Sequence, residues 1–146
     1  MKLFIDADGC PVTDIAVGIA NTYQVPCTIV CDTSHEIVRP DVQTITVSKG
    51  ADSADFMLVN LLSPGDVVIT QDYGLAAMCL SKHAHVLHQD GFAYTQENID
   101  GLLFFRAAAK KARRAGARMK GPSKRTQAQN DAFARALEAL FREICP

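Results

Sequence analysis

Residues 2–12, KLFIDADGCPV, open the chain with a pattern that decides the fold prediction. The first five form a short apolar run that closes on Asp6, which is typical of a buried β-strand. A second acid, Asp8, follows in a glycine-containing loop. Pro11 suits the first turn of a helix, and apolar residues recur behind it at helical spacing as far as Tyr23. This stretch therefore predicts a strand, an acidic loop and a helix in succession.

Further strand-like segments follow, and most are separated by helical patterns. The predicted strands are 28–31 (TIVC), 44–47 (TITV), 67–70 (VVIT) and 84–87 (AHVL). The predicted helices cover 52–62, 73–81, 98–115 and a last segment, 126–145, which starts with a capping-box pattern. Alternating strands and helices predict an α/β fold: a mostly parallel central sheet of about five strands with helices on both faces. The length of 146 residues favours a single domain over 1–146.

The composition excludes several classes of protein. Hydrophobic residues make up 48% of the chain and charged residues 21%, which excludes intrinsic disorder. No apolar run has the length of a membrane span, and we expect no signal peptide. The five cysteines include no C-x-x-C pair, so neither a zinc ribbon nor a redox motif is predicted. We therefore expect a cytoplasmic protein with no membrane association.

Acidic residues follow successive predicted strands. Ligands bind outside the carboxyl ends of the strands in open parallel sheets, so these acids mark the expected site. Clustered carboxylates need a counter-charge, and a hard cation with oxygen ligands is the usual one. Removing one charge, as in Asp72→Asn, should then stabilise the metal-free protein. Each acid could instead be structural, for example as a helix cap. The candidate ligands for Mg²⁺ or Mn²⁺ are Asp6, Asp8, Asp52, Asp55, Asp72 and Asp90.

Four motifs together resemble the YaiI/YqxD family of bacterial proteins. They are DADGCPV (6–12), KGADSAD (49–55), TQDYGLA (70–76) and GPSKRT (121–126), and the resemblance covers essentially the whole chain. The family looks like a branch of the PIN-like nuclease superfamily, which implies a three-layer sandwich. By this resemblance Asp6, Asp72 and one acid of the Asp52/Asp55 pair would be metal ligands, with weaker support for Asp8 and Asp90. PIN-like proteins often carry Glu at the middle position, where this chain has only Asp.

The acidic loop is also similar to the D-x-D-G motif of haloacid-dehalogenase-type phosphatases. In such an enzyme Asp6 would be the nucleophile and Asp8 the general acid. The later acidic motif and the cap insertion of those phosphatases are missing here, and Pro11 departs from their usual motif. We therefore place a phosphatase second among the alternatives to the leading hypothesis given below.

The three histidines of HAHVLH (83–88) are expected to be exposed or edge residues, because nothing else supplies a tight zinc shell.

Charge is strongly segregated along the chain. Residues 1–105 carry 4 Lys/Arg and 13 Asp/Glu, whereas the basic segment, 106–125, carries 9 Lys/Arg and no acid. A solvated helix face would interleave the two signs, so this run favours a phosphate-bearing partner. Aromatic residues are scarce nearby, so we expect contacts to the nucleic-acid backbone rather than to bases. The predicted nucleic-acid-binding residues are Lys110, Lys111, Arg113, Arg114, Arg118, Lys120, Lys124 and Arg125.

The leading hypothesis joins the acids to the basic segment. It is a Mg²⁺- or Mn²⁺-dependent nuclease that cleaves RNA phosphodiesters with a metal-activated water, with Asp6 and Asp72 as the catalytic residues. The first alternative is a non-catalytic RNA- or nucleotide-binding PIN-like module, which needs only the basic segment. The expected partner is RNA or another phosphate-bearing ligand, and the sequence leaves the oligomeric state open.

Overall fold

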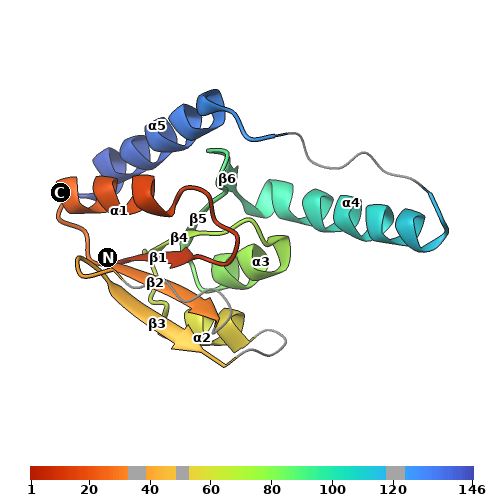
Figure 1. The fold of residues 1–146 in the computed structure, drawn as a ribbon, viewed down its shortest axis with the longest axis horizontal. Coiled ribbons are helices and arrows are strands. Elements are labelled where there is room, and N and C mark those ends of the chain that lie inside the picture. Colours follow the sequence, from red (N-terminus) through yellow and green to blue (C-terminus); the bar gives the residue numbers. More distant parts are fainter. Residues whose placement is uncertain (33–38, 49–52, 118–123) are drawn as a thin grey trace.

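A six-stranded sheet forms the centre of the computed structural model, which describes residues 1–32, 39–48, 53–117 and 124–146 (Figure 1). The strands run in the order β3-β2-β1-β4-β5-β6, and all neighbours pair in parallel except β5 and β6. The predicted α/β fold with a mostly parallel sheet is confirmed, with six strands in the described residues rather than about five. The strands are β1 (Leu3–Asp6), β2 (Cys27–Asp32), β3 (Gln43–Val47), β4 (Val67–Ile69), β5 (His85–Leu87) and β6 (Ala93–Tyr94).

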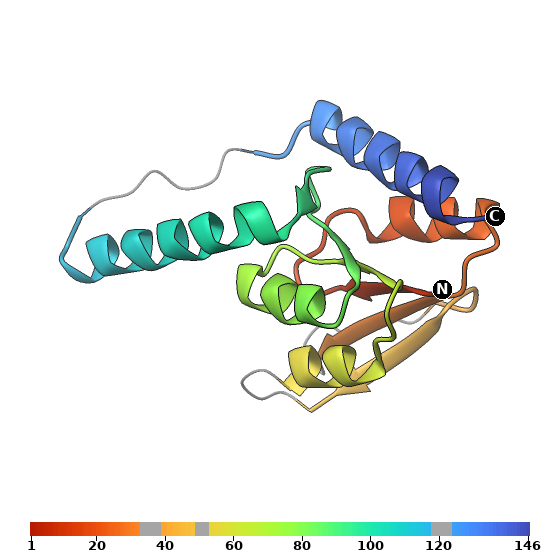
Figure 2. The same ribbon diagram turned by 180° about the vertical axis from the view of Figure 1, so that it is seen from behind.

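Helices cover both faces of this sheet. They are α1 (Thr13–Thr22), α2 (Ser53–Leu61), α3 (Tyr73–Ser81), α4 (Gln96–Arg114) and α5 (Gln127–Ile144). Helices α1 and α5 lie on one face, and α2, α3 and the start of α4 pack on the other (Figures 1 and 2). Within the described residues, no helix combines the length and the apolar character that a membrane crossing requires.

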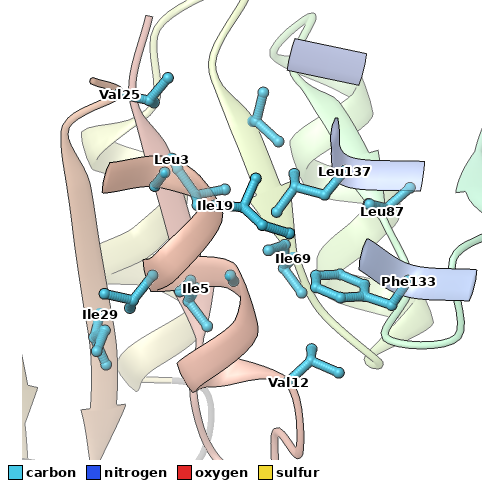
Figure 3. Close-up of a cluster of buried hydrophobic side chains, with 14 of the residues drawn as sticks. Leu3, Ile5, Val12, Ile19, Val25, Ile29, Ile69, Leu87, Phe133 and Leu137 are labelled. Carbon is cyan, nitrogen blue, oxygen red and sulfur yellow. The ribbon is translucent and has the colours of Figure 1, made fainter. Parts of the chain in front are cut away.

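Alternation along the strands divides the core between the two faces. In β1, Leu3 and Ile5 point toward α1 and α5, whereas Phe4 points toward α2 and α3. Figure 3 shows Phe133 and Leu137 of α5 packed over the aliphatic side chains of the central strands. Phe133, Leu137 and Phe141 recur every four residues and are fully buried. A buried phenylalanine contributes about 3–5 kcal/mol relative to alanine, so these side chains hold α5 firmly to the sheet.

Strand β6 is the element that the sequence did not predict. It contains two residues, which is too short to show alternation. A turn at Gly91, with a φ of +96°, brings it back beside β5. A Cβ at Gly91 would lie 2.7 Å from the carbonyl oxygen of Ala132 in α5, so only glycine fits this close approach. The glycine thus sets both the turn and its packing.

Helix α4 projects away from the rest of the molecule (Figures 1 and 2). Ile99 is its one buried residue, and the half-buried Leu102 and Leu103 pack beside it. Beyond them the helix is largely solvated, and Phe104 and Phe105 are 76% and 71% exposed. The predicted basic segment begins on this projecting part. Its residues 118–123 lie outside the described part of the chain.

The strand order reverses direction between β1 and β4. From β1 the chain moves outward through β2 to β3, and it returns to place β4 on the other side of β1. Sheets wound in this order bind ligands at the carboxyl ends of the strands where the direction reverses. Asp6 ends β1, and Thr70-Gln71-Asp72 follows β4. The topology therefore directs attention to these residues.

Candidate functional site

An open pocket lies at the carboxyl ends of β1, β2 and β4. Its volume is about 260 Å³, and five of its lining residues are aspartates. The aspartates come from separate segments: the end of β1, the following loop, the end of β2, the first turn of α2 and the residue before α3. Folding therefore concentrates negative charge that the sequence spreads over nearly half of the chain. The lining residues are Asp6, Asp8, Asp32, Ala54, Asp55, Gln71 and Asp72.

Thr70 connects the two central acids. Its hydroxyl donates a hydrogen bond to Oδ2 of Asp6 at 2.7 Å and accepts one from the backbone N–H of Asp72 at 3.0 Å. Thr70 is itself buried and held on both sides: its N–H donates to the carbonyl of Leu87, and its carbonyl accepts from the hydroxyl of Tyr94 at 3.2 Å. Thr70 therefore fixes the orientation of Asp6 and the start of the loop that carries Asp72.

Asp6 ionises less readily than an ordinary aspartate. Burial is the main cause, and the neighbouring carboxylates of Asp55, Asp8 and Asp72 add to it; together they raise the pKa of Asp6 from 3.8 to about 6, against the opposing effect of the Thr70 hydrogen bond. Ionised Asp6 is thus unfavourable unless a cation enters the pocket. A strongly shifted carboxyl group in an open pocket is typical of a functional site.

Asp72 has a structural role as well as a place in the pocket. Its Oδ1 accepts hydrogen bonds from the backbone N–H groups of Gly74 at 2.8 Å and Leu75 at 3.2 Å, so it caps the N-terminus of α3. The guanidinium of Arg106, which comes from α4, lies 3.4 Å from the same oxygen. Of the described residues, none donates a hydrogen bond to Oδ2 of Asp72. One oxygen therefore holds the helix, and the other is available to a ligand.

The loop after β1 borders the pocket through Asp8. Gly9 has a φ of +67°, and the N–H of Cys10 donates to the carbonyl of Ala7 to close the turn. Asp8 accepts a hydrogen bond from the backbone N–H of Asp32 at 3.3 Å, which ties this loop to the end of β2. A Cβ at Gly9 would lie 3.2 Å from the side-chain nitrogen of Gln71, so glycine allows the two loops to close on each other.

Comparison with known proteins assigns the chain to a family. The profile of the family described as "Uncharacterized BCR, YaiI/YqxD family" matches residues 4–143. The chain belongs to the YaiI/YqxD family. A UPF0178 protein of Exiguobacterium sibiricum is 46% identical to it over 143 residues, covering 98% of each chain. A UPF0178 protein of Clostridium acetobutylicum is 46% identical over 146 residues, covering 99% of this chain and 96% of the relative. No solved structure matches the chain.

The structure brings four of the six predicted metal ligands of this YaiI/YqxD protein into one pocket. They are Asp6, Asp8, Asp55 and Asp72. Asp52 lies outside the described residues. Asp90 is not among the pocket's lining residues; its Oδ1 lies 2.6 Å from Nη1 of Arg125.

Four polar residues of the site were not predicted, and Thr70, described above, is one of them. Asp32 ends β2 beside β1, and the rule that selected Asp6 would have found it had the second strand been extended by one residue. Gln71 lies between Thr70 and the predicted Asp72 and lines the pocket. Arg106 was counted in the basic segment but was not selected as a site residue. Its contact with Asp72 joins residues 34 positions apart, so no local pattern could indicate it.

The predicted nucleic-acid-binding residues fall into three groups. Lys110, Lys111, Arg113 and Arg114 are exposed on the last turns of α4, and Lys124 is exposed before α5. Arg118 and Lys120 lie outside the described residues. Arg125 is half-buried and makes internal contacts: besides Asp90, it donates to the carbonyl of Gln89 and to the side chain of Asn130, both at 2.6 Å.

The prediction that the histidines of residues 83–88 are exposed or edge residues is wrong for His88, which is buried. Its ring stacks on Phe92 with centroids 4.3 Å apart, and its Nδ1 accepts a hydrogen bond from the N–H of Asp90. These contacts stabilise the turn between β5 and β6. His85, by contrast, is exposed.

The donor set of the pocket fits a hard divalent cation. Neither His nor Cys is among the described lining residues, and carboxylate oxygens are the ligands that Mg²⁺ and Mn²⁺ prefer. The open volume also suits Mg²⁺, which usually keeps several of its waters. As the described side chains stand, no three His, Cys, Asp or Glu residues are grouped closely enough to hold an ion by themselves. A bound ion would therefore need water ligands or small movements of the carboxylates.

Proposed function

We propose that this protein is a Mg²⁺- or Mn²⁺-dependent nuclease that cleaves RNA phosphodiesters, and that its fold is the three-layer PIN-like sandwich. The observation that carries the proposal is the convergence of five aspartates in one open pocket where the strand order reverses. Asp6, Asp55 and Asp72 would hold the ion, with Asp8 and Asp32 beside them. When bound, the ion supplies an activated water and neutralises charge on the reacting phosphate.

The chain's own residues would orient these groups. The Thr70 hydroxyl donates to the carboxylate of Asp6 and accepts from the backbone N–H of Asp72, so it would limit how far the two residues move while substrate enters. Arg106 places a positive charge at the rim of a pocket that would otherwise repel a phosphate. Its side chain is 55% exposed and its contact with Asp72 is long, so a phosphate oxygen can compete for it at little energetic cost.

The cations of α4 would hold the RNA backbone. Arg106, Lys110 and Arg113 recur at intervals of four and three residues, so they share one face of the helix. That face is continuous with Ile99 and Leu102, which pack on the body. At about 1.5 Å per residue, the three cations span on the order of 10 Å and lead from the pocket along the projecting helix. Backbone contacts of this kind bind without reading the sequence.

Cleavage of a fluorescently labelled single-stranded RNA in Mn²⁺ tests the proposal. We expect native protein to cleave it, and Asp6→Asn from a parallel preparation to lose at least about 100-fold in rate, because the acid belongs to the cation site. The matched control is Asp100→Asn, which removes an exposed acid of α4 outside the pocket and should keep full activity.

Two other outcomes would overturn the nuclease. Salt-dependent RNA binding without cleavage in either Mn²⁺ or Mg²⁺ would identify the non-catalytic binding module. Release of inorganic phosphate from a phosphomonoester, dependent on Asp6 but with no cleavage of RNA, would identify the phosphatase.

A further inference from the structure

A second cavity adjoins the acidic pocket between α2, α3 and α4. Its volume is about 280 Å³, and Asp55 and Asp72 line both spaces. The other walls are different in character: Phe56 comes from α2, Leu75 and Met78 come from α3, and Arg106 comes from α4. An aromatic ring, two apolar side chains and one guanidinium therefore line an open cavity together with two of the pocket's carboxylates.

We propose that this cavity binds one unpaired base of a single-stranded nucleic acid, stacked on Phe56, while Arg106 contacts the adjoining phosphate. The inference rests on the proposed function, because it assigns to this cavity the nucleotide next to the phosphate held in the acidic pocket. A duplex keeps its bases stacked inside, so a subsite of this kind selects unpaired strands.

Phe56 is exposed because the opposite side of α2 packs against the core. Leu58 and Leu62 are buried in the core on that side, whereas Phe56 is 58% exposed. A single exposed hydrophobic residue is common and carries no functional meaning alone. Phe104 and Phe105 are more exposed still, yet neither lines the acidic pocket or this cavity. Phe56 differs because it shares a cavity with a cation and two carboxylates.

The chain couples the two spaces directly. Asp55 and Phe56 are consecutive in α2, so the acid faces the pocket while the next side chain lines the cavity. Gly74 lies at the junction on α3. A Cβ there would be 3.3 Å from Oδ1 of Asp72 and 3.6 Å from Nη1 of Arg106, so glycine leaves room at the point where they meet. A phosphate bridging the two spaces would find Arg106 at their shared rim.

The size of the cavity suits part of a ligand. Sites for whole drug-sized molecules measure about 300–1,000 Å³. A cavity of about 280 Å³ is therefore sufficient for one base of a longer strand, with the rest of the strand outside. Stacking on an aromatic ring tolerates any base, because every base presents a π-face. The subsite should accordingly discriminate single strands from duplexes more than one base from another.

The absence of tryptophan from the sequence allows a direct test. Phe56→Trp places the protein's only indole in the cavity, and Phe104→Trp places one on the side of α4 opposite Arg106. Each variant is titrated with a short single-stranded RNA both in EDTA, where no metal-dependent cleavage occurs, and in Mn²⁺ within the time before cleavage, and RNA counts as failing to bind only if it fails in both. We expect saturable fluorescence quenching for Phe56→Trp and little change for Phe104→Trp. An oligomer with the same backbone but abasic sites should still bind and should not quench.

A second measurement does not depend on the new indole. Phe56→Leu should weaken RNA binding about 5- to 100-fold in fluorescence anisotropy, as loss of one base–aromatic stack does. Phe56→Tyr keeps an aromatic ring at this position and should retain the affinity of the native protein. The circular dichroism spectrum of each variant must match that of the native protein. Phe105→Leu, a change at a ring that does not line the cavity, serves as the control.

The outcomes separate this inference from the proposed function. Equal quenching at the two positions, quenching by the abasic oligomer, or failure of RNA to bind would overturn the base subsite. Base-dependent quenching at position 56 without any cleavage in Mn²⁺ would support the subsite and overturn the nuclease. Cleavage in Mn²⁺ without base-dependent quenching at position 56 would support the nuclease and overturn the base subsite.

Discussion

Replacing Asp6 by asparagine should stabilise the metal-free protein at pH 8. In the folded state the pKa of Asp6 is about 6, against 3.8 for an ordinary aspartate, so the folded protein binds this proton more tightly than the unfolded chain does. The resulting stabilisation is complete below about pH 3.8 and is lost as the pH rises through about 6. The asparagine side chain carries no charge, and its carbonyl oxygen can still accept the hydrogen bond from Thr70.

The size of the effect follows from the shift in pKa. Each unit corresponds to about 1.36 kcal/mol, so ionised Asp6 lowers the free energy of unfolding by at most about 3 kcal/mol at pH 8. At pH 5 the folded protein is mostly protonated at Asp6. From the two pKa values, the loss in the free energy of unfolding at this pH is roughly half of the loss at pH 8. The stability advantage of Asp6→Asn should therefore shrink by about half between pH 8 and pH 5.

Urea unfolding in EDTA at pH 5, 6, 7 and 8 measures this advantage. Asp100→Asn, which removes an exposed charge outside the pocket, is the matched control. Saturating Mn²⁺ at pH 8 should stabilise the native protein more than Asp6→Asn, because the ion binds only the folded state. An advantage that is constant across the pH range, or a variant less stable than native protein at pH 8, would refute the assignment of Asp6 as a destabilised anion.

Three further predictions concern Asp72, Arg125 and the cations of α4. Asp72→Ala should lower the free energy of unfolding by about 1 kcal/mol in urea titrations, because α3 loses its N-cap, whereas Asp72→Asn, which retains a capping oxygen, should lower it less. Arg125→Ala should lower the free energy of unfolding by about 1–3 kcal/mol, seen in calorimetry as a lower melting temperature, because its contacts with Asp90, Gln89 and Asn130 are internal. Lys124→Ala, at an exposed position, should leave the melting temperature unchanged. Lys110→Ala and Arg113→Ala should each reduce the slope of log RNA affinity against log salt by about one in anisotropy titrations, and a slope equal to that of the native protein would exclude α4 from RNA binding.

The two predictions for Asp72 differ because the crowding of acidic charges does not alone determine the effect of removing one of them on stability. From the sequence, Asp72 is one more anion in a repulsive cluster, and its removal is expected to stabilise the protein. In the structure its Oδ1 receives two backbone N–H groups and lies near the guanidinium of Arg106. These contacts make Asp72 the N-cap of α3, so removing its side chain also removes a stabilising cap. The stabilising substitution is therefore expected at Asp6, whose pKa is raised mainly by burial.

The central strands and the acids at their ends could be predicted because local signals determine them. Apolar runs of strand length give β1, β2 and β4, and an acid directly after a buried strand must lie at its carboxyl end. Asp6 and Asp72 were found in this way. Asp8 was selected as the second acid of the loop after Asp6, and Asp55 as the acid three residues after Asp52 in the predicted helix. Asp32 was missed only because the predicted second strand ended at Cys31, one residue before the observed end of β2.

The contacts between distant segments could not be predicted from local patterns. Arg125 belongs to a segment that contains nine cations and no acid, yet its guanidinium is committed to Asp90, 35 residues earlier. Arg106 belongs to the same run and lies at the acidic pocket, because Ile99 and Leu102 anchor the start of α4 on the body. Whether a cation in this segment faces solvent, a partly buried acid such as Asp90, or the pocket depends on packing that the charge pattern does not encode.

The segregated charges have a physical consequence for any phosphate ligand. A pocket of five carboxylates repels a phosphodiester, and the cations of α4 alone would hold the strand beside the pocket rather than over it. Arg106 is the described cation that lies within 4 Å of one of the pocket's carboxylates, at Oδ1 of Asp72. It offers an approaching phosphate one favourable contact at the rim, and a divalent ion would offer the others inside. Binding of the ion and of the strand should therefore reinforce each other, since each reduces the charge repulsion that opposes the other.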